Sequence, residues 1–86
     1  MAQKKEEPAY ERRLGRISVA VWKNQSKGKA VWFNTIIVRH YKDGDKWEET
    51  TSFGRDDLPL VEKVSALAYD WIWKQEVPMQ PDESKE

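Results

Sequence analysis

The chain of 86 residues contains no cysteine. Disulfide bonds, thiolate nucleophiles and cysteine-based zinc sites are therefore excluded. Only four glycines are present, and none belongs to a glycine-rich loop that would hold a phosphate before a helix. No apolar run approaches the roughly 18 residues that a helix needs to cross a bilayer, and the first residues lack the apolar stretch of a signal peptide. From these absences we expect a cytoplasmic protein.

Side chains that could support catalysis are also scarce. The single histidine, His40, stands within a predicted strand, where a lone histidine is more often a surface or pairing residue than a general base. Neighbouring acids at residues 48–49 point to opposite faces of a strand, and those at 56–57 suit a helix start. The acidic turn at 43–45 lacks the later ligands of a calcium loop. We therefore expect no catalytic residues, no metal, no cofactor and no enzymatic activity.

What the chain does contain is an uneven distribution of charge, although its formal net charge is zero. Residues 12–46 hold nine Lys or Arg and two acids, a balance of +7, whereas residues 47–86 hold four Lys or Arg and ten acids, a balance of −6. The basic part also carries Trp22, Trp32 and Phe33. Basic side chains among aromatic rings suit an extended polyanion whose bases can stack, which favours single-stranded nucleic acid.

The length allows one domain. Residues 1–13 and 76–86 are mostly polar or charged, and we expect them to be mobile tails around a single α+β domain over residues 14–75. A domain this small buries a modest share of its surface, and large aromatic rings are one way to build its core. Each tryptophan can therefore be a core residue or a binding residue. Dimerisation is another means of stabilising a small core.

The first part of this domain has the pattern of β-strands. Alternation of Ile17, Val19 and Val21 with other residues predicts a strand over about 16–23, and a stretch that is apolar on both faces predicts a central strand over about 30–42. The Asp-Gly pair at 43–44 favours a tight hairpin into a third strand over about 46–53, which could be split in two.

A helix follows the strands. It begins between residues 55 and 59, because Pro59 fits only near a helix start, and it ends near residue 75. Apolar residues at three- and four-residue spacing give it one broad apolar face. Tyr69 and Trp73 lie four apart on another side, where a symmetry mate or a tail could cover them. We expect an antiparallel sheet of three or four strands with one C-terminal amphipathic helix packed on one face.

Two assignments of the sheet faces are nearly equal in apolar count. In the first, Ile17 and its alternating neighbours lie under the helix, which leaves Arg16 and Trp22 on the open face. The second strand then turns Phe33 inward and sends Arg39 towards an acid near the helix edge. Its open residues would be Trp32, Asn34, Ile36, Val38 and His40. We favour this assignment slightly and leave the opposite one open.

The layout is similar to that of a known family. The stretch Ile36-Ile37-Val38-Arg39-His40-Tyr41, followed by Asp43-Gly44, Trp47 and a helix from Asp57, resembles the C-terminal domain of the transcriptional coactivator p15 (positive cofactor four) family. The resemblance covers roughly residues 15–75. The segment Phe53-Gly54-Arg55-Asp56-Asp57-Leu58 also resembles a segment of small uncharacterised bacterial proteins.

The resemblance implies a homodimer joined through its helices and a curved sheet face that binds single-stranded DNA. By position, the DNA-binding residues would be Arg16, Trp22, Lys23, Lys29, Trp32 and His40. Trp71 and Trp73 would lie in or near the dimer interface, together with Tyr69 from the helix pattern. The acids at residues 48–49 and 56–57 depart from the family, which has a basic segment before its helix.

A second function class stays open. Ile36 and Val38, if exposed, and the pair Tyr69 and Trp73 could meet a protein partner instead, which would make the chain an interaction or assembly module. Binding to phosphates weakens steeply with added salt, whereas an apolar interface weakens much less. The sequence does not distinguish DNA from RNA, and it identifies no protein partner.

Overall fold

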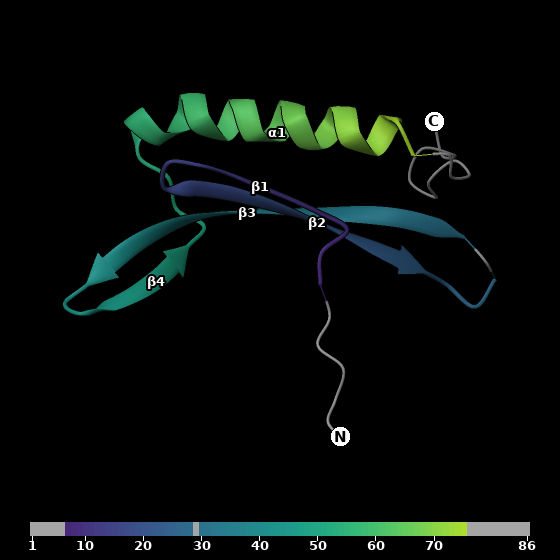
Figure 1. Cartoon of the computed structure of the whole chain (residues 1–86), viewed down its shortest axis with the longest axis horizontal. Coiled ribbons are helices and arrows are strands. Elements are labelled where there is room, and N and C mark those ends of the chain that lie inside the picture. The colour runs from purple at the N-terminus through teal and green to yellow at the C-terminus, as the bar shows by residue number, and fades with distance from the viewer. Residues whose placement is uncertain (1–6, 29, 76–86) are drawn as a thin grey trace, which may run out of the picture.

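The computed structural model describes residues 7–28 and 30–75, which form an α+β domain. A four-stranded antiparallel sheet, ordered β1-β2-β3-β4, is followed by a short 3-10 turn and one helix. The elements are β1 (Tyr10–Leu14), β2 (Ile17–Gln25), β3 (Val31–Asp43), β4 (Lys46–Thr50), η1 (Arg55–Asp57) and α1 (Leu58–Trp73). Figure 1 shows α1 across one face of the sheet, with the ends of the β2–β3 and β3–β4 hairpins curving away from it. The predicted fold class is confirmed.

Strand β1 corrects the prediction that residues 1–13 form a tail. Tyr10–Leu14 pairs along β2, with Tyr10 opposite Val21 and Leu14 opposite Ile17. The two-residue loop between the strands begins at Gly15, whose φ of 60° is easily adopted only by glycine. The alternation rule missed this strand because three charged residues separate its two apolar ones. Residues 1–6 and the predicted tail at 76–86 lie outside the described residues.

The other two hairpins follow the sequence pattern closely. Asp43 lies opposite Lys46, so Gly44 and Asp45 form the predicted two-residue turn, and Gly44 has a φ of 65°. Strand β4 is a single short strand that ends at Thr50, earlier than the predicted end. Phe53, beyond the strand, packs against the core instead of extending the sheet.

The core lies between α1 and the near face of the sheet. Its buried apolar residues are Ile17, Val19, Val21, Phe33, Val64 and Ala68. Burying a valine or isoleucine side chain fully contributes about 1.5–3 kcal/mol. Trp71 closes one end of this core, since its ring stacks on Tyr10 at 5.2 Å and meets Phe33 edge-on at 5.4 Å between ring centroids.

A buried carboxylate, that of Asp57, connects the start of the helix to the sheet. It accepts a hydrogen bond from the Gly54 N–H at 2.8 Å and another from Arg16 Nε at 2.6 Å, and Arg39 Nε lies 3.3 Å away. The Gly54 hydrogen bond, followed by the contributions of Arg16 and Arg39, outweighs the opposing effect of burial and lowers the pKa of Asp57. We call these three charged side chains the Asp57 clamp.

The helix α1 has 16 residues. Within the described part of the chain, no helix has the length and apolar character needed to span a membrane. Pro59 lies in its first turn, as predicted, where a missing N–H costs no intrahelical hydrogen bond.

Candidate nucleic-acid interface

The face of the sheet turned away from α1, here called the open face, carries a set of residues fixed by the strand register. Because directly opposite residues of paired strands share a face, the register places there Glu11, Arg13, Ser18, Ala20, Trp22, Asn24, Trp32, Asn34, Ile36, Val38, His40, Lys42, Trp47 and Glu49. This is the favoured of the two assignments made from the sequence. Arg39 points to the helix side and reaches an acid, as that assignment required.

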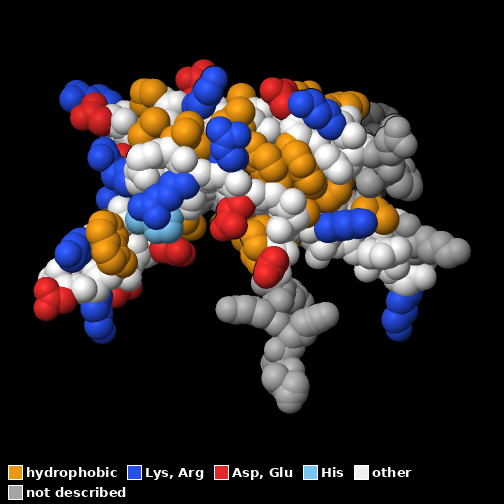
Figure 2. Space-filling view, in the orientation of Figure 1, with side chains coloured by type: hydrophobic (Ala, Val, Ile, Leu, Met, Phe, Trp, Pro, Cys, Tyr) orange, Lys and Arg blue, Asp and Glu red, His pale blue; other side chains and the backbone are white. Residues whose placement is uncertain are grey.

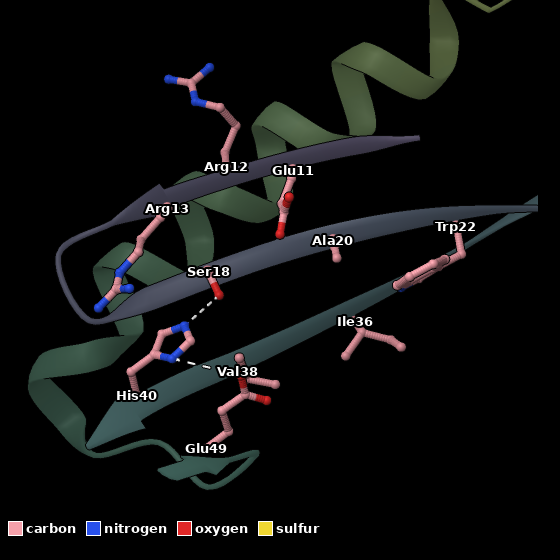
Figure 3. A pocket seen from close by; sticks show the side chains of 10 residues that line it. All are labelled: Glu11, Arg12, Arg13, Ser18, Ala20, Trp22, Ile36, Val38, His40 and Glu49. Atoms are coloured by element: carbon pink, nitrogen blue, oxygen red, sulfur yellow. Dashed lines mark hydrogen bonds and ion pairs between the residues drawn. The ribbon is translucent and has the colours of Figure 1, made fainter. Parts of the chain in front are cut away.

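The open face is hollowed. A recess of about 550 Å³ is lined by Glu11, Arg12, Arg13, Ser18, Ala20, Trp22, Ile36, Val38, His40 and Glu49. Figure 3 shows Trp22 at one end of this recess and His40 with Glu49 at the other, while Arg12 points away from it. Figure 2 shows a hollow on the underside of the molecule, beside the β3–β4 hairpin. We call this recess the central hollow.

Three tryptophans are distributed over the open face. Trp22 and Trp32 are half-buried and occur on neighbouring strands, opposite Asn34 and Asn24 respectively. Trp47 is 65% exposed and lies opposite Lys42, whose Nζ is 5.7 Å from the centre of its ring. Exposed indole faces of this kind accept stacked bases of any identity.

A polar cluster occupies the end of the central hollow nearest β4. Ser18 Oγ and His40 Nε2 share a hydrogen bond of 2.8 Å, and His40 Nδ1 is 3.8 Å from a Glu49 oxygen. The order serine, histidine, acid resembles a hydrolase triad, but 3.8 Å is too long for a hydrogen bond. Ser18 also lies in a regular strand paired on both sides, so its own N–H is not free to stabilise an oxyanion.

Charges of both signs surround the central hollow. Arg13 is exposed, and its Nε donates to the Gly15 carbonyl at 2.9 Å. Lys42 stands on the adjoining hairpin. Glu11 and Glu49 contribute two carboxylates from the two edge strands. The open face therefore combines stacking surfaces and cations with acids that a simple phosphate-binding surface would not need.

The structure brings together only part of the predicted DNA-binding set. Trp22, Trp32 and His40 share the open face. Arg16 differs from the expectation: it lies in the turn before β2, where strand alternation no longer fixes its direction, and its side chain pairs with Asp57. Lys23 is exposed but lies opposite Phe33, on the helix side of the sheet. Lys29 lies outside the described residues.

The residues predicted for a dimer interface lie in two different environments. Trp71 packs against Tyr10 and Phe33, so it belongs to the chain's own core. Tyr69 and Trp73 are 62% and 66% exposed, and their rings meet edge-on at 6.1 Å. They line a shallow surface depression of α1 and remain uncovered within the described residues.

Sequence reasoning missed two parts of the open face. Trp47 was not included in the predicted binding surface, although the two-residue turn at Gly44 fixes its pairing with Lys42 once the hairpin is recognised. Glu11 and Arg13 were assigned to a tail. The signal that was available for them was Gly15, two residues before an alternating strand, where a tight hairpin loop begins.

Comparisons of this chain with protein-family models, with curated proteins and with solved structures found no match. A functional argument therefore depends on the geometry and chemistry of the open face.

Proposed function

We propose that this protein is a non-enzymatic module of the cytoplasm that binds single-stranded nucleic acid on the open face of its sheet. One observation carries the proposal: Trp22, Trp32 and Trp47 all lie on the face that the helix leaves uncovered. If these three rings served only to build the core, we would expect them under α1, where Trp71 packs against Phe33. The resemblance to the p15 coactivator family, which was noted from the order of strands and C-terminal helix, stays a prediction.

In this proposal the bases stack and the phosphates pass the cationic edges of the face. Stacking of one base on an aromatic side chain contributes roughly 1–3 kcal/mol. Lys42, beside Trp47, and Arg13, on edge strand β1, are placed to contact phosphates on either side of the central hollow. Three bases stacked at the upper end of this range, together with these phosphate contacts, reach the roughly −8 kcal/mol that corresponds to micromolar binding.

The test is a fluorescence-anisotropy titration of a labelled, mixed-sequence single-stranded DNA of about 12 nucleotides at low and moderate salt. We expect micromolar binding that weakens steeply as salt is added. Trp22→Ala should weaken binding about 5- to 100-fold, whereas Leu58→Ala, a change at an exposed apolar residue of the helix, should leave it unchanged. No binding at low salt, or equal losses in both variants, would overturn the proposal.

A separate observation favours self-association. The exposed pair Tyr69 and Trp73 is a surface on which a second copy of this chain could pack its own helix. We propose that the protein is a homodimer joined there, with Trp71 excluded because its ring is already packed internally. The uncovered open face then remains available to nucleic acid in both copies.

Sedimentation equilibrium tests the dimer. The wild-type chain should sediment as a dimer and Trp73→Glu as a monomer, while Trp47→Glu, a matched change at 65% exposure on the open face, should stay dimeric. A monomeric wild-type chain would contradict the dimer and direct attention to a different protein partner for this surface.

A further inference from the structure

Two acids occur in the central hollow, in the middle of the face proposed for a polyanion. Glu49 enters from β4, close to His40, and Glu11 enters from β1 on the opposite edge of the sheet. Figure 3 shows Glu11 pointing from β1 over β2, towards the same recess that Trp22 bounds. The remaining charges of the lining are Arg12, which points away from it, and Arg13.

An ionised carboxylate only accepts hydrogen bonds. Phosphate oxygens are also acceptors and carry negative charge, so Glu11 and Glu49 repel a backbone that passes through the hollow. A base edge behaves differently, because the exocyclic amino groups of cytosine, adenine and guanine donate hydrogen bonds. A glutamate accepts such a bond from the cytosine amino group in known nucleic-acid complexes. Thymine and uracil present a carbonyl oxygen where cytosine has its amino group.

The geometry provides room for such a base edge. A base stacked against Trp22 would lie beside Glu11, which pairs with Ala20, and the next base of the strand would reach Ser18, His40 and Glu49 at the other end of the recess. The hydroxyl of Ser18 and the ring of His40 can each donate or accept, depending on the histidine tautomer. They can therefore satisfy a ring nitrogen beside the amino group, while the carboxylate accepts from the amino group itself.

The neighbouring part of the open face has an unused donor as well. Asn24 Nδ2 is buried and has no hydrogen-bond partner among the described residues. The residue Asn24 lines a smaller recess of about 330 Å³, together with Trp22, Asn34 and Ile36. A buried donor without a partner is unfavourable, and asparagine is a side chain that reads base edges. Both recesses next to Trp22 therefore carry groups suited to base edges.

We propose that the central hollow selects bases with an exocyclic amino group over thymine and uracil, with Glu49 and Glu11 as the selecting groups. The inference rests on the proposed nucleic-acid binding, and it gives the two acids a role in specificity. The binding face then reads base chemistry as well as stacking bases.

The test compares oligodeoxycytidine with oligodeoxyuridine of about eight nucleotides, two probes whose bases differ only in the amino or carbonyl group and the accompanying ring proton. We expect the cytidine oligomer to bind about tenfold more tightly, equal to about 1.4 kcal/mol. In Glu49→Gln this ratio should fall, because the uridine oligomer gains affinity as repulsion is removed and the cytidine oligomer loses a charge-assisted hydrogen bond. Glu11→Gln should shift the ratio in the same direction.

The matched control is Glu48→Gln. Glu48 is the chain neighbour of Glu49 but lies opposite Tyr41, on the helix side of the sheet. The Glu48→Gln variant changes the net charge of the protein by the same amount as Glu49→Gln, but it should keep the wild-type ratio of the two affinities. Wild-type binding without preference, or a ratio that persists in both Glu49→Gln and Glu11→Gln, would overturn the selectivity alone. Absence of binding to either oligomer would overturn the proposed function itself and the inference with it.

Discussion

The two faces of the sheet are made from the same strands and have opposite character. Along β2, Ile17, Val19 and Val21 are buried under α1, while the residues between them remain half-buried on the other side. On the helix side, the carboxylate of Asp57 pairs with Arg16 and Arg39. On the open face, rings and charges of both signs remain accessible. One face therefore accounts for stability, and the other is available for binding.

The largest expected effect is a difference in stability between a substitution on the helix side and one on the open face. Ile17 is 0% exposed, whereas Ile36 is 50% exposed on the open face. Ile17→Ala should lower the free energy of unfolding by about 2–5 kcal/mol, because it removes buried methyl groups and leaves a cavity. Ile36→Ala should cost less than about 1 kcal/mol. Urea unfolding monitored by tryptophan fluorescence measures both. Equal losses would show that the open face is also a core.

The next effect concerns the Asp57 clamp. Asp57→Asn removes the charge that pairs with Arg16 and Arg39. We expect the variant protein to melt several degrees below the wild-type chain at neutral pH. Because the pKa of Asp57 is lowered on folding, its stabilising contribution is complete above the ordinary value of 3.8 and is lost as the pH falls through the folded value.

Thermal melts of both proteins between neutral and strongly acidic pH check this dependence. The difference in stability between the wild-type chain and Asp57→Asn should be constant near neutral pH and should shrink below about pH 4. A difference that does not change with pH would mean that the carboxylate charge makes no contribution to the clamp. Nucleic-acid binding should be retained by the folded variant, because Asp57 lies on the helix side.

The smallest effect concerns electrostatics on the open face. Lys42→Ala should reduce the slope of log affinity against log salt by about 0.7, the value for one phosphate contact on a single strand. Lys63→Ala removes an equal charge from exposed α1 and should leave the slope unchanged. Anisotropy titrations at several salt concentrations measure both slopes. Equal changes in the two variants would indicate a general effect of net charge.

Much of the helix side could be predicted from the sequence. The alternation of Ile17, Val19 and Val21 identified the buried face of β2, and the Asp-Gly turn fixed the hairpin at Gly44. The inward direction of Arg39 belonged to the slightly favoured of two face assignments, and the contact of Arg39 with Asp57 agrees with that assignment. These features are local, because a strand repeats every two residues and a two-residue turn fixes its own register.

The errors occurred where position depends on contacts distant in the sequence. Arg16 alternates with Ile17, yet it lies in a turn and its side chain reaches Asp57, 41 residues away. Trp71 was placed in or near a dimer interface by the family resemblance, whereas its ring stacks on Tyr10, a residue that had been assigned to a tail. The cluster of Ser18, His40 and Glu49 comes from three different strands, and only the register brings it together.

The contrast between the faces can be tested most directly with the five tryptophans. Their indole N–H signals can be resolved in a nitrogen-edited NMR spectrum and assigned by single Trp→Phe substitutions. On titration with single-stranded DNA, the signals of Trp22, Trp32 and Trp47 should shift, and those of Trp71 and Trp73 should not. Shifts confined to Trp73, or unshifted open-face signals at saturating DNA, would contradict the assignment of binding to the open face.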